Sequence, residues 1–169
     1  IDPETGDELI FDLEGNKVVL NATNSVSERK VMGKPYPDFY GGINNSFEFN
    51  RVGIDIFFVF NQGQMIYDDH GKRQLGNMGF GWNQDIRSLD YWAENGDITD
   101  VPTLSLTENR DINSSRHLYD ASYIRLRNLS INYKLSEKIC KKLNAVSLKI
   151  FLSAQNLAVW TKYKGWDPE

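Results

Sequence analysis

Apolar and polar residues alternate regularly along four stretches of the chain. In the cleanest stretch the alternate positions are all large and apolar: Ile54, Ile56, Phe58 and Phe60. Alternation with a period of two places one set of side chains on each face of a β-strand. The same pattern predicts antiparallel strands near residues 42–50, 54–66, 123–135 and 146–156. The chain is therefore predicted to be all-β.

Residues 121–157 predict a hairpin of two long strands, each with an apolar stripe along one side. The stripe positions are Leu129, Ile131, Tyr133 and Leu135, and then Leu148, Ile150, Leu152 and Ala154. Between the strands we expect a short solvated helical turn that begins at an N-cap, Ser136. This turn carries Lys138, Lys141 and Lys142. A contact of these lysines with lipid phosphate is the alternative.

The stripe of the third strand is interrupted at its start. Arg125 and Arg127 have the same parity as Leu129, so strict alternation places two charges on the apolar face. A charge facing lipid at mid-membrane costs about 2–4 kcal/mol. We expect this end of the strand to project beyond the apolar layer, and a β-bulge that switches the two faces is the alternative.

Short turns and long connections alternate between the predicted strands. The first and third connections are short, whereas residues 68–122 form a long irregular loop, and residues 1–41 and 158–169 are irregular too. Residues 54–66 are long enough for the roughly 9–11 residues of a membrane-spanning strand. Short turns on one side and long loops on the other are typical of an up-and-down transmembrane β-barrel. A β-sandwich shares this asymmetry only by chance.

In a barrel, the polar-face residues Asp55 and Lys149 are expected to point into the lumen. The aromatic strand ends are expected at the membrane interfaces, with Phe39, Tyr40 and Tyr67 outside and Tyr133 inside.

Composition and charge exclude several classes of protein. The longest apolar run is residues 56–60, which excludes a membrane helix of about 20 residues. The mean hydropathy of -0.49 is typical of a soluble protein. It does not exclude a β-barrel, because the strands of a barrel alternate apolar and polar residues and never build a long apolar run. The formal net charge of -4 provides no basic footprint for nucleic acid. A lone cysteine, Cys140, excludes an intramolecular disulfide and is expected to be a packed thiol.

The sequence points to no catalytic, cofactor-binding or metal site, and it leaves the substrate-binding residues unknown. His70 and His117 lie in the long loop and are expected to be solvated, and no nucleophile-elbow motif accompanies them. The acidic residues of positions 2–14 lack the spacing of an EF-hand. The glycine-rich residues 76–82 lack the Lys-Ser/Thr ending of a phosphate-binding loop. Four tryptophans are expected in loops, packing them together or stacking on sugars: Trp82, Trp92, Trp160 and Trp166.

Five strings, in this order, carry a resemblance to a known family. They are PDFYGGI at 37–43, SSR at 114–116, SYIRLRNL at 122–129, QNL at 155–157 and TKYKGWDPE at 161–169. Together they resemble the C-terminal barrel portion of SusC/RagA-type TonB-dependent outer-membrane transporters of Bacteroidetes. The resemblance covers most of the chain and is weakest over residues 1–30.

The resemblance implies a fold, a location and partners. Members of the family are plugged barrels of the roughly 22-stranded class in the outer membrane. They import glycans or peptides with energy from TonB, and a SusD-like lipoprotein caps them. The sequence shows no plug, no TonB-contacting segment and no final strand, so we expect it to be a fragment of a longer protein with about four spanning strands. We expect no enzyme activity and no cofactor. The alternative is a soluble all-β glycan-binding or adhesive module.

Overall fold

The structure, a computed structural model, describes residues 1–75, 78–106 and 112–169, and it divides into two compact units. The sheet unit comprises Lys34–Met65 and Asp120–Glu169, and the loop unit comprises Ile1–Gly33 and Ile66–Tyr119. Each unit therefore combines two separate segments of the sequence, and each is described by itself.

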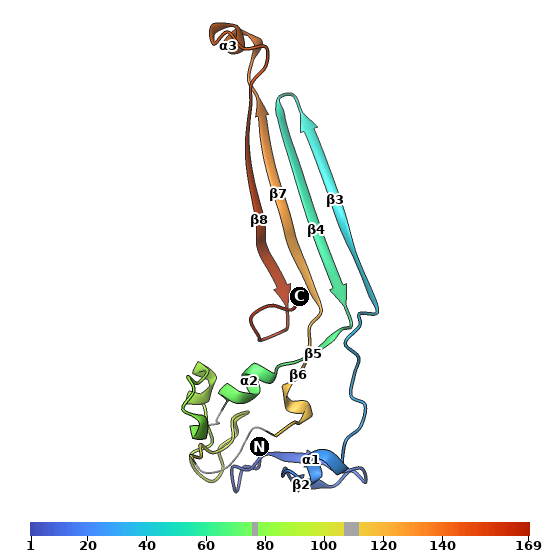
Figure 1. The fold of residues 1–169 in the computed structure, drawn as a ribbon, viewed down its shortest axis with the longest axis vertical. Coiled ribbons are helices and arrows are strands. Elements are labelled where there is room, and N and C mark those ends of the chain that lie inside the picture. The colour runs from blue at the N-terminus through green and yellow to red at the C-terminus, as the bar shows by residue number, and fades with distance from the viewer. Residues whose placement is uncertain (76–77, 107–111) are drawn as a thin grey trace. The chain divides into compact units, whose positions relative to one another are not determined.

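The sheet unit is built on four long antiparallel strands that lie side by side (Figure 1). They are β3 (Phe39–Phe49), β4 (Val52–Gln62), β7 (Tyr123–Lys134) and β8 (Lys149–Thr161), in the order β3-β4-β7-β8. The all-β prediction is confirmed. Over the described residues this sheet is open, with β3 and β8 as its two edges.

The strand ends differ from the predicted ones where the backbone turns. The predicted strand 54–66 ends at Gln62, because Gly63 has a φ of 87° and turns the chain. The N–H of Gly63 donates to the hydroxyl of Ser122 at 2.9 Å. The next residues form a separate short strand, β5 (Met65–Tyr67), which pairs with β6 (Leu118–Asp120). Tyr67, expected at the membrane end of a long strand, is therefore outside the four-stranded sheet.

A β-bulge interrupts β7 at Arg127. Phe57 pairs with Asn128 and Phe58 pairs with Leu126, so Arg127 is an extra residue relative to β4. On the other side, β8 has two residues opposite Arg127, and one of them, Asn156, has a left-handed φ of 52°. An extra residue in one strand reverses the alternation beyond it.

The bulge corrects the expected position of the arginines. Arg125 pairs with Val59, on the face of the sheet opposite to Phe58. The neighbouring Leu126 and Ile124 take the places on the apolar face that strict alternation assigned to charged residues. The expectation that this end projects beyond the apolar layer is wrong, and the bulge is the explanation for the interrupted stripe.

The turn between β7 and β8 contains α3 (Glu137–Lys142), which has a hydrogen-bonded cap at its C-terminal end. At its start, Ser136 has an extended backbone, but its side chain makes no cap hydrogen bond, contrary to prediction. At its end, Asn144 has a φ of 52°, and its N–H donates to Lys141 O at 3.2 Å. The N–H of Ala145 donates to Cys140 O at 3.0 Å, which completes a Schellman motif. Cys140 is buried beneath the turn, as expected for a packed thiol.

The loop unit is a folded body rather than a single irregular connection. Residues 1–33 contribute a hairpin of β1 (Leu9–Phe11) and β2 (Lys17–Val19), followed by α1 (Asn24–Ser27). In its described residues, the predicted long loop contributes four short helices: α2 (Asp69–Gln74), η1 (Met78–Phe80), η2 (Ile86–Leu89) and η3 (Ser115–His117). Leu75, Val101 and Pro102 are buried in this unit. Part of the glycine-rich segment, residues 76–77, lies outside the described residues. In the described part of the chain, every helix is too short or too polar to cross a membrane.

Candidate functional site

The four-stranded sheet has one face made almost entirely of apolar side chains, called the apolar face below. The register aligns cross-strand rows such as Phe47-Ile54-Ile131-Leu152 and Ile43-Phe58-Leu126-Ala158. Further rows add Phe49, Val52, Tyr133, Ile150, Ile56, Leu129, Ala154, Phe60, Ile124 and Trp160. Two β3 positions on this face lack an apolar side chain, namely Gly41 and Asn45.

No side chain of the apolar face is buried by the described residues. Leu152 is 73% exposed and Phe49 is 81% exposed, and the β4 members are half-buried at most. Trp160, expected in a loop, lies on this face in β8, where its ring packs against Phe58 with centroids 6.4 Å apart. A continuous apolar surface of this extent normally marks contact with another protein or with lipid.

The opposite face, called the polar face, carries hydrogen-bonding groups along most of its rows. Its rows include Ser46-Asp55-Ser130-Ser153 and Asn44-Phe57-Asn128-Gln155. Asp55 accepts a hydrogen bond from the hydroxyl of Ser46 at 2.6 Å. Lys149 lies opposite Lys134 at the end of the β7-β8 ladder. The two faces of one sheet thus differ sharply in polarity, which is the feature that a membrane barrel wall requires.

The last residues of the chain bind to the arginines at the bulged end of β7. The Arg125 side chain is 7% exposed and pairs with Asp167, while its Nε lies 3.6 Å from Glu169. Arg127 pairs with Glu169 at 2.6 Å. Hydrogen bonding from Arg125 holds the pKa of Asp167 below its usual value. Each of the two arginine charges is therefore balanced by a carboxylate of the tail.

The tail is also fixed by neutral contacts. Gln64 Nε2 donates to Pro168 O at 2.7 Å, and Pro168 is buried. The ion pairs of the tail with Arg125 and Arg127 were not predicted from the sequence, because the partners are 42 positions apart. The only available signal was the break that Arg125 makes in the apolar stripe.

The loop unit is tied together by a cluster around Glu8. Ser114 Oγ donates to Glu8 at 2.6 Å, and Arg116 Nη1 donates to the same carboxylate at 2.9 Å. Arg116 Nη2 also donates to Asp100 O at 2.5 Å. Ser114 and Arg116 belong to the SSR string at 114–116, so that string joins the long connection to the N-terminal segment.

His117 is buried, which contradicts its prediction as a solvated loop residue. It is 2% exposed, and its ring packs edge-on against Tyr67 at 6.3 Å between centroids. Burial, aided by the charge of Arg116, lowers the pKa of His117 to about 4. The neutral, buried imidazole packs against Tyr67, and the hydroxyl of the nearby Ser114 donates to Glu8. His70, by contrast, is exposed as expected.

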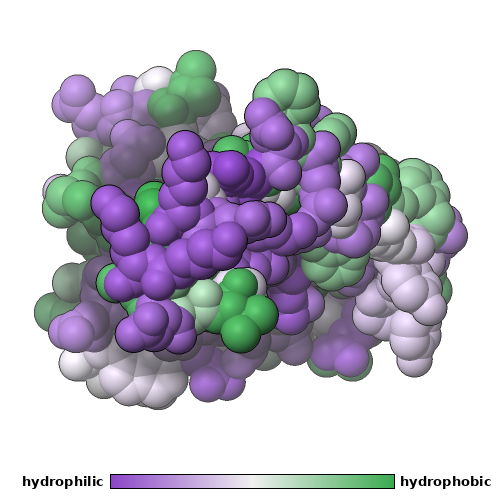
Figure 2. Space-filling model, turned by 90° about the horizontal axis from the view of Figure 1, so that it is seen from above, coloured by the Kyte–Doolittle hydropathy of each residue, from purple (hydrophilic) through white to green (hydrophobic). Residues whose placement is uncertain are grey.

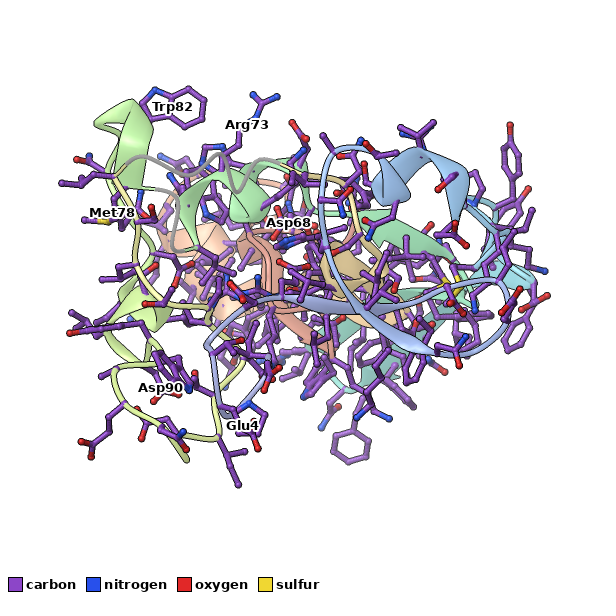
Figure 3. The ribbon with its side chains drawn as sticks, turned by 90° about the horizontal axis from the view of Figure 1, so that it is seen from below. Glu4, Asp68, Arg73, Met78, Trp82 and Asp90 are labelled. Carbon is purple, nitrogen blue, oxygen red and sulfur yellow. The ribbon has the colours of Figure 1, made fainter. Side chains whose placement is uncertain are left out.

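Two further tryptophans belong to the loop unit, where they pack against neighbours. Trp92 covers Gly6, where a Cβ atom would lie 2.5 Å from the indole ring, and its Nε1 donates to Pro3 O at 3.1 Å. Trp82 lies beside Arg73, with the guanidinium 5.7 Å from the ring centroid (Figure 3). Trp166 is 94% exposed in the tail of the sheet unit.

The acidic residues near the N-terminus form turns. Asp12 accepts hydrogen bonds from the Asn16 side-chain amide at 3.0 Å and from the Asn16 backbone N–H at 2.8 Å, and these two bonds, the first most of all, lower the pKa of Asp12. Asp2 Oδ1 accepts the N–H of Glu4 at 2.9 Å. Within residues 1–75, 78–106 and 112–169, no group of three His, Cys, Asp or Glu side chains has the arrangement needed to hold a metal ion.

Comparisons with known proteins agree with the geometry of the sheet. Two TonB-dependent receptors of Formosa agariphila are 34% identical over 168 residues and 30% identical over 169 residues, covering 99% and 97% of this chain. Among solved structures, the RagAB peptide importer in its open-open state matches 99% of the chain with a TM-score of 0.76 at 26% identity. A structure of the RagAB peptide transporter matches equally well, with a TM-score of 0.76 at 28% identity. A comparison with protein-family models finds no match.

The chain spans a small part of these relatives. It covers 16% of each receptor and 18% to 19% of the matched RagAB chains. Its homologues are TonB-dependent receptors and transporters, not enzymes, and the resemblance to the SusC/RagA type is confirmed.

Proposed function

We propose that this chain, a homologue of TonB-dependent receptors over almost its whole length, forms four adjacent strands of an outer-membrane importer barrel. The observation that carries this proposal is the apolar face, which continues across all four strands and is left uncovered by the described residues. In water such a face favours aggregation, whereas against hydrocarbon it needs no further partner.

The dimensions of the sheet fit a bilayer. Strand β4 has 11 residues, which all pair with β3 and, except for Gln62, also pair with β7. Eleven residues extend about 34 Å along the strand, or about 26 Å along the membrane normal at a tilt of about 40°. The apolar band of an outer-membrane barrel is about 25 Å tall.

The edges of the sheet support a place in a larger wall. Strands β3 and β8 each pair on one side only, and their free edges carry unpaired backbone groups next to exposed apolar side chains. Such edges are not tolerated in the hydrocarbon layer. We infer that further strands of the same protein continue the sheet from both edges and close a barrel, with the polar face toward the lumen.

Cargo and partners follow from the family and from the relatives. We propose that the barrel imports oligosaccharides or peptides, and the solved relatives described as peptide importers favour peptides. The long segments of the loop unit are proposed to face the cell exterior, beneath a SusD-like lipoprotein. TonB is proposed to supply the energy for import, as the names of the related receptors imply.

A pair of neighbouring substitutions tests the proposal. Phe58 lies on the apolar face and Phe57 lies on the polar face, in the row of Asn44 and Gln155. We expect Phe58→Asp to reduce assembly into the outer membrane severalfold, because it places a carboxylate against lipid, whereas Phe57→Asp retains most assembly. The measurement is the amount of heat-modifiable, folded receptor in the outer-membrane fraction.

Two results would contradict the proposal. One is equal assembly of the two variants. The other is a wild-type chain that is monodisperse without detergent and shields Phe58 from solvent, which would identify the soluble glycan-binding or adhesive module instead.

A further inference from the structure

The turn between β7 and β8 carries a concentration of positive charge, and we call residues 134–149 the basic tip. The tip contains five lysines and one glutamate, a formal charge of +4, whereas the whole chain has a net charge of -4. The lysines are Lys134, Lys138, Lys141, Lys142 and Lys149, and all are exposed. Among the described residues, Lys134 has an acidic partner, Glu48 at 3.4 Å. The other four have none in that part of the chain.

The fold holds three of these lysines together on one side of a short helix. Lys138 and Lys141 are three residues apart in α3, and Lys138 and Lys142 are four apart, so their side chains share a face. The Schellman motif at Asn144 and the buried Cys140 fix the helix against the end of the hairpin. Three like charges held so close repel one another. Lys141 and Lys142 are partly compensated, because they lie in the last turn of α3, where the helix dipole favours positive charge.

Large apolar side chains lie next to the lysines and are left exposed. Ile139 is 44% exposed, Leu143 is 60% exposed and Val146 is fully exposed. Seen from the end of the sheet that carries α3, hydrophilic side chains lie nearest the viewer with hydrophobic ones beside them (Figure 2). A surface that combines lysines with exposed aliphatic groups is typical of segments that lie in the interface of a membrane.

The basic tip follows directly after the last apolar row of the sheet, Phe49-Val52-Tyr133-Ile150. The next pair along β7 and β8 is Lys134 and Lys149, on the polar face, and the helix α3 lies beyond it. If the apolar face contacts hydrocarbon, the tip lies at the level of the lipid head groups. A cationic patch at that level attracts anionic head groups, and each lysine near such a surface contributes a factor of about five in association.

We propose that the basic tip binds the phosphate groups of anionic phospholipids, such as phosphatidylglycerol, in the leaflet next to the short turns. The proposal rests on the proposed function, since it requires the apolar face to be in the bilayer. The tip anchors the turn end of the wall at a fixed depth, with Ile139, Leu143 and Val146 in the acyl boundary and the lysines at the phosphates.

The test uses the full natural protein that carries this segment, reconstituted into nanodiscs of phosphatidylcholine with and without phosphatidylglycerol. Native mass spectrometry then counts the phosphatidylglycerol molecules retained on the protein after release. We expect Lys138→Gln combined with Lys142→Gln to lower that enrichment by about tenfold to thirtyfold at low salt. Glutamine has a helix propensity close to that of lysine, so α3 persists.

A matched control removes the same charge elsewhere. Lys17→Gln combined with Lys30→Gln changes two exposed lysines of the loop unit and should leave the enrichment unchanged. Lys138→Arg combined with Lys142→Arg keeps the charge and should retain binding.

The outcomes separate the two proposals. If the wild-type protein inserts but shows no preference for phosphatidylglycerol, or if the glutamine variant keeps its preference, the tip proposal is wrong. The same holds if the tip lysines are protected by an acidic polypeptide rather than by lipid. If the wild-type protein inserts into neither type of nanodisc, the proposed barrel itself is wrong.

Discussion

The loop unit and the sheet unit differ in what surrounds their large apolar side chains. In the loop unit, Leu75, Val101 and Pro102 are buried, together with the polar residues Lys72, Ser88 and His117. In the sheet unit, the large side chains of the apolar face are exposed or half-buried, whereas Arg125 and Asn132 are among the buried residues, at 6% and 7% exposure of the whole residue. The two units are built from one chain of average composition, yet they follow different rules of burial.

The difference indicates the solvent for which each unit is built. Apolar burial stabilises a protein body in water by about 25 cal/mol per Å², and the loop unit uses this effect. A sheet that faces lipid is not stabilised by burying its apolar side chains inside the protein. Its backbone N–H and C=O groups must instead form their hydrogen bonds within the sheet. The ladder from β3 to β8 meets that condition along most of its length, apart from its two edges and the bulge at Arg127.

The largest expected effect comes from placing a charged side chain on the apolar face of the sheet unit. Leu129 lies on the apolar face in the row of Ile56, and Ser130, the next residue, lies on the polar face beside Asp55. We expect Leu129→Arg to destabilise the membrane-inserted protein by about 2–4 kcal/mol and Ser130→Arg by less than about 1 kcal/mol. Urea unfolding in lipid vesicles measures both. Equal costs would show that the two faces meet the same environment.

The next largest effect is a pH dependence of the stability of the loop unit, caused by the buried His117. Because the pKa of His117 is about 4 in the folded protein against 6.5 for an ordinary histidine, the unfolded state binds more protons between these values. Stability should therefore be complete above about pH 6.5 and fall by about 3 kcal/mol as the pH drops to about 4. The aspartates with lowered pKa, such as Asp69 and Asp85, add to the loss only at lower pH.

Hydrogen exchange of the amides around Asp68, whose N–H donates to His117 O, measures this loss locally. His117→Gln should remove the dependence between pH 6.5 and 4, and His70→Gln, at an exposed position, should leave it in place. A wild-type loop unit with flat protection over this range would contradict the prediction.

The smallest effect concerns packing at a single glycine of the loop unit. Gly6 has a φ of 74° and lies under the Trp92 ring, whereas Gly15 has a φ of 92° and nothing within 4 Å of a Cβ atom. We expect Gly15→Ala to cost about 1 kcal/mol from backbone strain alone. Gly6→Ala should cost about 1 kcal/mol more, because the indole must also move. Tryptophan fluorescence during urea unfolding reports both variants, and equal costs would mean that the indole moves freely.

Several features of the fold were predictable because they depend on neighbours in sequence. The alternation of Ile54, Ile56, Phe58 and Phe60 sets one face of β4, whatever it pairs with. The same holds for the polar-face position of Asp55 and for the helical turn before Asn144. These inferences use local periodicity and turn chemistry, which survive without knowledge of the partners.

Other features were beyond local reasoning. The bulge at Arg127 arises from the register that β7 must keep with both β4 and β8, so it is a property of three strands together. The burial of His117 depends on Tyr67 and on segments brought from elsewhere in the loop unit. The ion pair of Arg125 with Asp167 likewise joins positions 42 residues apart.

The order of residues along the chain is enough to infer an all-β protein whose strands have one apolar side and which resembles an outer-membrane importer. The face that each residue of β7 occupies, the loop residues that are buried, and the carboxylates that neutralise the arginines become known only once the segments are packed together. The physical reason is that alternation is a property of one strand, whereas register, burial and charge pairing exist only between segments that the fold brings together.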